Sequence, residues 1–321
     1  MFDIILSISI LIAGILLMVV SSDKAVEHSI LVASAVGMSP LMIGVLLVSL
    51  GTDLPEIANS IISCALGHGS INAGDAIGSV LTQLTLVLGI LPFFGGAFKV
   101  KRDEIIVIGA CEVLALLLVF SIVEKGNISR INALFLVGSW ALYMLITKVI
   151  TGKNLGGEDP ARLRAELADK RAGEAYSMAI AVLGFIGVAF GAYAVIQSVI
   201  TLSTNLKVPE YLISFFMVSI GTSLPELAVD LTALRKGECE IAIGDIIGSC
   251  IVDASFSIGI GQVFFPQRIS GELASPTTFY TLLASVIVIL TLAVREKVDK
   301  KAGALFILLY LLSYILLFIK F

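Results

Sequence analysis

Two short stretches place a proline and then a glutamate inside strongly apolar sequence. One reads "GTDLPE" and ends at Glu56, and the other reads "GTSLPE" and ends at Glu226. A proline costs a helix interior about 3 kcal/mol, and a carboxylate at the centre of a bilayer costs roughly 2.5–3.5 kcal/mol. Because Pro55 and Pro225 lack an N–H, each leaves the carbonyl four residues earlier without its helical partner. Free carbonyls, threonine hydroxyls and carboxylates are ligands of hard cations such as Ca²⁺ and Na⁺.

A second polar pattern follows each of these stretches. It reads "GDAIGSVLTQ" in the first copy and "GDIIGSCIVD" in the second. Side chains at positions i, i+4 and i+8 lie within about 80° of one another on a helix of 3.6 residues per turn. Each pattern therefore predicts one polar stripe along a helix. The two stripes are Asp75, Ser79 and Gln83, and Asp245, Ser249 and Asp253.

Both patterns belong to one internal repeat. Residues 48–90 align without a gap with residues 218–260, and 17 of the 43 pairs are identical. Five predicted membrane spans separate a residue from its copy, and an odd number of crossings inverts the second copy in the membrane. Inverted repeats with broken helices that meet near the bilayer midplane are typical of secondary transporters. The inversion would bring both stripes and both glutamates to one oxygen-lined site.

The acids of this expected site have no fixed counter-charge, since no Lys or Arg lies in the four spans that carry them. Glu56, Glu226 and Asp253 would together cost on the order of 10 kcal/mol if they were charged and unpaired. That cost rivals the stability of a typical domain. Mobile cations or protons must therefore neutralise the acids. A site that cannot cross the membrane empty and charged must exchange one set of cations for another.

The composition places the chain in a membrane. Of its 321 residues, 58% are hydrophobic and 14% are charged, whereas soluble domains average roughly 25% charged residues. The net charge of −4 gives no indication of a nucleic-acid partner, and the four cysteines show no metal-binding or disulfide pattern. We expect no enzyme activity, no cofactor besides the transported ions, no obligatory protein partner and a monomer in the lipid bilayer.

The sequence predicts an all-α integral membrane protein of about ten transmembrane helices, because each span needs about 20 apolar residues. The predicted organisation is a first five-helix repeat over 1–150, a cytoplasmic linker over 151–175 and a second five-helix repeat over 176–321. The broken helices 2, 3, 7 and 8 form the expected ion-binding core. The spans lie near 2–20, 38–66, 71–95, 103–123, 131–151, 176–200, 209–234, 241–265, 275–294 and 302–320.

The distribution of Lys and Arg predicts the orientation of these spans. With the N-terminus outside, 16 of the 21 Lys and Arg residues lie in loops on the inside. Because positive charge gathers on the cytoplasmic side, both termini are expected outside the cell and the central loop in the cytoplasm. We expect the protein in the plasma membrane.

With these motifs the sequence resembles the cation/Ca²⁺ exchanger superfamily, and most closely its prokaryotic Na⁺/Ca²⁺ exchangers. The α-repeats of that family read G-T-S-x-P-E followed by G-N-x-x-G-S-N. The resemblance implies Glu56 and Glu226 as central bridging carboxylates and Asp253 as the acid that closes the second half. It implies that Ca²⁺ competes with Na⁺ for overlapping sites and that spans one and six slide against the core. Further oxygens would come from Thr52, Ser79, Thr222, Ser249 and the carbonyls of Ser49 and Ser219.

The chain departs from the family pattern at several polar positions. The family usually has Ser where Asp53 stands, Asn where Asp75 and Asp245 stand, and Asn where Gln83 stands. Asp230 lies one turn after Glu226, where Ser is common in the family. The extra acids also fit a protein that couples to protons or carries another divalent cation on the same fold.

Two other classes of protein stay open at this point. Asp75 and Asp245 are candidates for the dyad of an intramembrane aspartyl protease, although both lack the Gly-x-Gly-Asp pattern of such enzymes. A passive cation channel is the remaining alternative.

Overall fold

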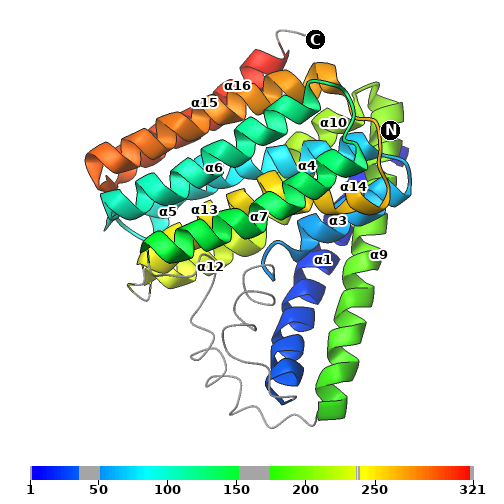
Figure 1. Ribbon diagram of the computed structural model, residues 1–321. Coiled ribbons are helices and arrows are strands. Elements are labelled where there is room, and N and C mark those ends of the chain that lie inside the picture. Colours follow the sequence, from blue (N-terminus) through cyan, green and yellow to red (C-terminus); the bar gives the residue numbers. More distant parts are fainter. Residues whose placement is uncertain (1, 36–50, 152–173, 236, 238, 319–321) are drawn as a thin grey trace.

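The computed structural model describes residues 2–35, 51–151, 174–235, 237 and 239–318, and these residues are almost wholly helical (Figure 1). Eight of the described helices are long and apolar enough to cross a membrane. The predicted second span and the linker fall partly outside the described residues. The all-α membrane fold predicted from the sequence is confirmed, with the number of about ten spans as an approximation.

The first half of the chain supplies helices of very different lengths. Three of its helical segments, α4, η2 and α5, run on directly from one another, and η2 is π-helical. The elements are α1 (Phe2–Ala35), α3 (Leu54–Ala65), α4 (Gly69–Leu81), η2 (Thr82–Val87), α5 (Leu88–Phe94), β1 (Phe98–Lys99), α6 (Arg102–Val123) and α7 (Arg130–Thr151).

In its described residues the second half follows nearly the same order of helices, but its strand lies between α15 and α16. The π-helical segments η3 and η4 interrupt two of its spans. The elements are α9 (Glu174–Leu206), α10 (Glu210–Ile213), η3 (Ser214–Val218), α11 (Ser219–Thr222), α12 (Leu224–Arg235), α13 (Cys239–Val252), η4 (Asp253–Ser257), α14 (Ile258–Phe264), α15 (Gly271–Arg295), β2 (Lys297–Val298) and α16 (Lys300–Phe318).

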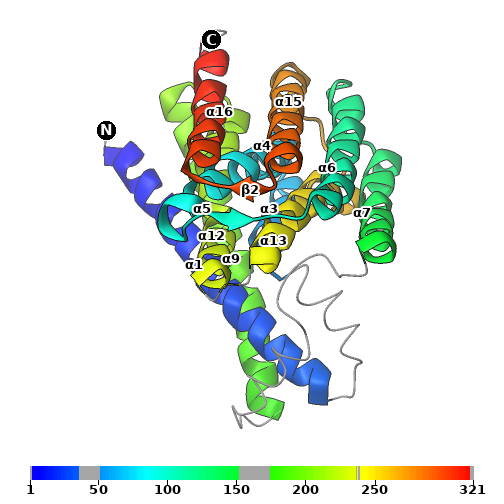
Figure 2. The same ribbon diagram turned by 90° about the vertical axis from the view of Figure 1, so that its left-hand side faces the viewer.

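Helices α1 and α9 form a long pair that leans away from the other helices (Figures 1 and 2). They pack mainly against each other, and a Cβ atom on Gly191 would lie 2.8 Å from the carbonyl oxygen of Gly14. Helix α1 continues 15 residues beyond the predicted end at residue 20. The ion pair of Lys24 with Glu27 (2.9 Å) contributes to this extension, since opposite charges at i and i+3 stabilise a helix in polar sequence.

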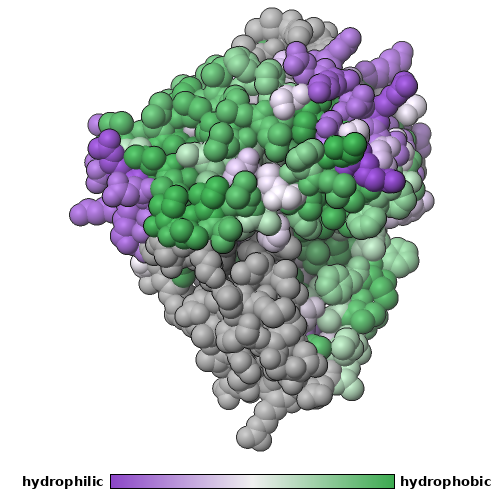
Figure 3. Space-filling view, in the orientation of Figure 1, coloured by the Kyte–Doolittle hydropathy of each residue, from purple (hydrophilic) through white to green (hydrophobic). Residues whose placement is uncertain are grey.

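The remaining helices form one bundle whose two halves are tied together at both ends. At one end β1 pairs with β2, so that Lys99 lies opposite Lys297. At the other end Asn127 and Arg268 form an isolated bridge. The repeat offset of 170 relates Asn127 to Lys297, so the two ties occupy nearly equivalent places in the two copies. Figure 3 shows an apolar band between two hydrophilic ends, as a bilayer requires.

Two of the π-helical segments are related by the internal repeat. Segments η2 and η4 begin at Thr82 and Asp253, which differ by one residue from the repeat offset of 170. Each follows a stretch of α-helix that carries a predicted polar stripe. The predicted stripes require 3.6 residues per turn throughout, but the last residue of each stripe, Gln83 or Asp253, lies in a π-helical segment. A π-helical turn holds one more residue than an α-helical turn, and such turns are frequent at functional sites.

Candidate ion-binding site

The two proline motifs place their glutamates in equivalent positions. Helix α3 begins at Leu54 and helix α12 at Leu224, so each proline stands in the first turn of a new helix, where its missing N–H is tolerated. Glu56 and Glu226 lie in those first turns, and a carboxylate is favoured at the N-terminus of a helix. Both glutamates are buried, with exposed fractions of 2% and 0%. The breaks therefore point two carboxyl groups into the protein interior.

Besides the bonds that Thr222 donates to Asp75 and Cys250 donates to Gln83, four hydrogen bonds between side chains of the described residues cross from the first repeat to the second in this region. In one, Gln83 Nε2 donates to Asp253 Oδ2, and in another, Ser249 Oγ donates to Asp53 Oδ2. The other two join hydroxyl groups. The pairs are Gln83 with Asp253 (3.2 Å), Ser249 with Asp53 (3.4 Å), Ser79 with Thr222 (3.4 Å) and Thr82 with Ser219 (3.3 Å). Since every bond joins the two repeats, neither repeat builds this region alone.

We call this buried region the core site. Its members share deep burial and an oxygen-bearing or amide side chain. They are Asp53, Glu56, Asn59, Asp75, Ser79, Thr82, Gln83, Ser219, Thr222, Glu226, Asp230, Asp245, Ser249 and Asp253. The structure thus brings together nearly all the residues that the sequence singled out. Thr52 is half-buried at its edge, and Ser49 lies outside the described residues.

The aspartate of the GD motif has different polar neighbours in the two copies of the repeat. In the first copy Asn59 Nδ2 donates to Asp75 at 2.5 Å, and Thr222 Oγ1 donates to the other oxygen of Asp75 at 3.3 Å. In the second copy the acid Asp230 lies beside Asp245. Asn59 was not among the predicted site residues. Its position one turn after Glu56, on the same face of α3, was the signal in the sequence that could have found it.

Several carboxyl oxygens of the core site lack a hydrogen-bond donor. Both oxygens of Glu56, Glu226 and Asp230 are buried without a partner, as is one oxygen each of Asp53 and Asp253. Among the described residues, no Lys, Arg or His forms an ion pair with any of these five acids. Burial of an unpaired charge costs several kcal/mol. These oxygens therefore need protons or metal cations.

The negative charges of the core site also act on one another. The carboxyl group of Glu226 lies within electrostatic range of Glu56, Asp53 and Asp245. The carboxyl group of Asp253 is similarly placed relative to Glu56 and Asp75. Unit charges repel strongly where water is excluded. The simultaneous ionisation of these acids is therefore unfavourable unless cations lie among them.

The backbone carbonyls near the breaks differ from the expectation. The carbonyl of Gly51, predicted to be free, accepts the N–H of Leu54 at 3.3 Å and the hydroxyl of Ser22 at 3.2 Å. That prediction was wrong for Gly51 because a turn and a side chain from α1 replace the lost helical bond. The carbonyl of Ser219 accepts the N–H of Ser223 at 3.2 Å. The Thr222 hydroxyl also lies within hydrogen-bond distance of this carbonyl, at 3.4 Å, so the Ser219 carbonyl already has partners inside the protein.

The acids surround one region without meeting at a single point. In the part of the chain that the structure describes, no three Asp, Glu, His or Cys side chains converge closely enough to form a metal centre. Side-chain carboxylates, hydroxyls and the Gln83 amide are instead distributed along four helices. Such an arrangement offers several partial oxygen sites for small cations rather than one closed coordination shell.

Comparison with known proteins agrees with this architecture. A family model described as sodium/calcium exchanger protein matches residues 6–149 and 176–319. A protein of Alkalimonas amylolytica named putative antiporter CaxA is 26% identical over 315 residues, which cover 95% of this chain and 96% of that protein. The inner membrane protein YrbG of Escherichia coli is 29% identical over 289 residues, 88% of this chain and 87% of its own length.

Two solved structures share the fold over nearly the whole chain. The sodium-calcium exchanger NCX_Mj covers 97% of this chain and 99% of its own, with 25% sequence identity and a TM-score of 0.60. The H⁺/Ca²⁺ exchanger CAX covers 96% of this chain and 82% of its own, with 18% identity and a TM-score of 0.73. The matches to both repeats, along almost the full length, show that this chain belongs to the sodium/calcium exchanger protein family.

Proposed function

We propose that this chain is a secondary active antiporter that exchanges Ca²⁺ for Na⁺ by alternating access. The observation that carries the proposal is the core site, where hydrogen bonds from both repeats surround glutamates whose oxygens have no donor. Glu56 and Glu226 serve as central ligands and Asp253 closes the second half. The remaining oxygens come from Asp53, Asp75, Asp245, Gln83, Thr52, Ser79, Thr222, Ser249, Ser49 and Ser219.

Sodium as the coupling ion rests on the motifs and on one relative. "GTSLPE" at 221–226 matches the Na⁺/Ca²⁺ exchanger pattern fully, and the sodium-calcium exchanger NCX_Mj is 25% identical to this chain over nearly all its length. The two solved relatives rank differently by the two measures of similarity. NCX_Mj has the higher sequence identity to this chain, whereas CAX has the higher TM-score. The overlay therefore does not choose between Na⁺ and H⁺.

A second candidate function is a proton-coupled exchanger, or a carrier of another divalent cation, on the same fold. The observation that favours it is Asp230, a fully buried acid without a hydrogen-bond donor beside Asp245. Two neighbouring acids attract a proton or a cation between them. Flux that follows a pH gradient and ignores Na⁺ would select this candidate.

The test is ion-replacement flux in reconstituted vesicles. Vesicles loaded with Ca²⁺ should release it when external Na⁺ is raised, and replacement of Na⁺ by choline should stop the release. Glu56→Gln and Glu226→Gln should each abolish the release, because the amide removes the charge that binds a cation. Glu124→Gln, at an exposed position after α6, is the matched control and should exchange like the wild type. Normal release in both core variants would overturn the assignment.

The proposal includes the setting of the transporter. The protein works as a monomer in the plasma membrane, with both termini outside and the central loop in the cytoplasm. Residues 1–150 and 176–321 form its two five-helix halves. Lipid and the transported ions are its partners, and no nucleic acid or further cofactor takes part.

A further inference from the structure

Glu112 is a buried carboxyl group that the core site does not include. It lies near the middle of α6 (Arg102–Val123) and has no exposed surface. Ser285 on α15 donates its hydroxyl to Glu112 Oε1 at 2.9 Å, and Oε2 has no hydrogen-bond partner. Among the described residues, no Lys, Arg or His forms an ion pair with Glu112. An acid buried in a membrane span destabilises the protein if it is charged and unpaired.

The internal repeat shows that the packing of α6 on α15 does not need this acid. At the offset of 170, Glu112 corresponds to Leu282 and Ser285 corresponds to Ala115. Both of these residues are buried and apolar, with exposed fractions of 9% and 0%. The equivalent contact between the same two helices is therefore apolar in the other copy. The fold tolerates Glu112 without requiring it.

The surroundings of Glu112 suit a proton better than a metal ion. Within the described structure the one oxygen bonded to its carboxyl group is the Ser285 hydroxyl. Ca²⁺ takes six to eight oxygen ligands, so two side chains leave such an ion badly undercoordinated. A proton needs a single carboxyl oxygen and removes the charge. We propose that Glu112 is a proton-binding site, separate from the transported-ion site, and that it keeps its proton through the transport cycle.

Polar contacts connect this proton site with the core site. Helix α6 packs against α7, α13, η4 and α15. From α15 the Ser285 hydroxyl reaches the carboxyl group, and the titratable side chains that the described contacts connect to it are Cys250 on α13 and, through Gln83, Asp253 on η4. Glu112 lies within electrostatic range of the Cys250 thiol, which donates to Gln83 Oε1 at 3.3 Å, and Gln83 in turn donates to Asp253. A proton bound to Glu112 neutralises its carboxyl group, so that Glu112 adds no negative charge beside the contacts of Cys250, Gln83 and Asp253.

Infrared difference spectroscopy tests the proposal directly. The spectrum of the wild-type protein minus that of Glu112→Gln, in lipid at neutral pH, should contain the carbonyl band of one protonated carboxylic acid. The band should be the same in Na⁺, in Ca²⁺ and in choline. A difference spectrum without such a band would overturn the proposal, because Glu112 would then be ionised. A band that disappears when Na⁺ or Ca²⁺ is added would also overturn it, because a metal ion would have displaced the proton.

A second variant keeps the proposal testable if Glu112→Gln does not fold. Ser285→Ala leaves the carboxyl group in place and removes the hydroxyl that bonds its oxygen. The carbonyl band should then persist and shift in frequency, whereas an unchanged band would show that it does not come from Glu112. Asp299→Asn, at the polar start of α16, is the control and should leave the band unaltered. Because this readout needs no Ca²⁺ flux, it stays decisive even if the proposed exchange activity fails its own test.

Discussion

Asn59 and Asp230 show that two copies of one motif have acquired different chemistry. Each lies about one turn beyond a motif glutamate, and each faces the aspartate of its own GD motif. The amide of Asn59 donates to Asp75 and leaves that carboxylate able to carry its charge. The acid Asp230 offers Asp245 a second negative group. The first half of the core site therefore holds charge more easily than the second half.

At this scale we predict that Asn59→Ala weakens cation binding. A hydrogen bond to a charged group contributes about 1.5–3 kcal/mol, which corresponds to roughly a ten- to hundredfold change in affinity. In a flux assay of the proposed exchange, this variant should show a KM for Ca²⁺ raised by about that factor. Asn205→Ala, at an exposed position near the end of α9, is the control. An unchanged KM for Asn59→Ala would show that Asp75 does not act in cation binding.

The sequence could identify the motif acids but not all their partners. Glu56, Glu226, Asp75 and Asp245 stand out because they recur at one offset. Asn59 corresponds to the apolar Val229 in the other copy, so the internal repeat does not mark it as a site residue. Glu112 escapes for a different reason, since it stands alone in a smooth apolar span and its partner Ser285 is 173 residues away.

Among the elements, α4 is held against the second repeat by contacts that only glycine permits. A Cβ atom on Gly78 would lie 2.3 Å from the carbonyl oxygen of Phe215 in η3, and one on Gly74 would lie 2.5 Å from that of Tyr211. Both distances are far below a normal contact. This close approach brings Ser79 within hydrogen-bond distance of Thr222. The glycines of the GD motif thus position the polar stripe of α4.

We therefore predict that Gly78→Ala separates α4 from η3. Overpacking of a well-packed interior costs about 1–3 kcal/mol, although alanine favours a helix more than glycine does. The variant should unfold at a lower temperature in detergent and lose much of its exchange flux. In Gly138→Ala on α7, where no described atom lies within 4 Å of the new Cβ, both properties should be retained. Equal behaviour of the two variants would argue against this role for Gly78.

Element boundaries were less predictable than element identities. Apolar periodicity located the long spans, but it ended the first span at residue 20, whereas α1 continues to Ala35. Apolar periodicity also does not predict the π-helical segments η2, η3 and η4 of the described residues, because a period of 3.6 residues per turn carries no signal for a local extra residue. Each described π-helical segment packs against helices of the other repeat, and a single window of sequence does not contain that packing.

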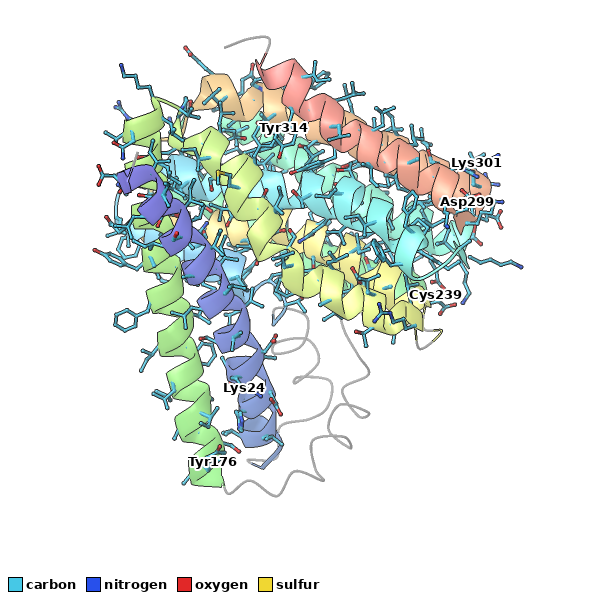
Figure 4. The ribbon with its side chains drawn as sticks, turned by 180° about the vertical axis from the view of Figure 1, so that it is seen from behind. Lys24, Tyr176, Cys239, Asp299, Lys301 and Tyr314 are labelled. Carbon is cyan, nitrogen blue, oxygen red and sulfur yellow. The ribbon has the colours of Figure 1, made fainter. Side chains whose placement is uncertain are left out.

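On the scale of the whole molecule, the ties between the halves mark the two faces of the membrane. Cys239, Asp299 and Lys301 lie at one end of the bundle, and Tyr314 lies towards the other (Figure 4). Helix α6 runs between the β1–β2 pair and the Asn127–Arg268 bridge. Its 22 residues span about 33 Å at 1.5 Å per residue, close to the roughly 30 Å of a hydrocarbon core.

This arrangement predicts the labelling of engineered cysteines. Lys125→Cys, just after α6, should react with a membrane-impermeant thiol reagent in intact cells. Lys301→Cys, beside β2, should react only after the membrane is opened. Both belong in a Cys239→Ser background, because the other three cysteines are buried and Cys239 is partly exposed. The reverse pattern would invert the orientation predicted from the Lys and Arg distribution.

The fold and the family followed from the sequence because the repeat and its motifs extend along most of the chain. The coupling ion did not follow. It depends on free-energy differences between Na⁺ and H⁺ at sites whose acids, such as Asp53 and Asp230, depart from the family pattern. Neither the identity of these side chains nor the backbone overlay on solved relatives measures those differences.

The hydrogen bonds that cross between the halves have a consequence for how such a gene arises. A gene for a single half would yield a working site only if its product entered the membrane in both directions and the two forms met face to face. Fusion of two such copies would fix one direction for each. After fusion, each position in one half could change without a change at the equivalent position in the other half. The differences between Asn59 and Val229 and between Glu112 and Leu282 fit such independent change.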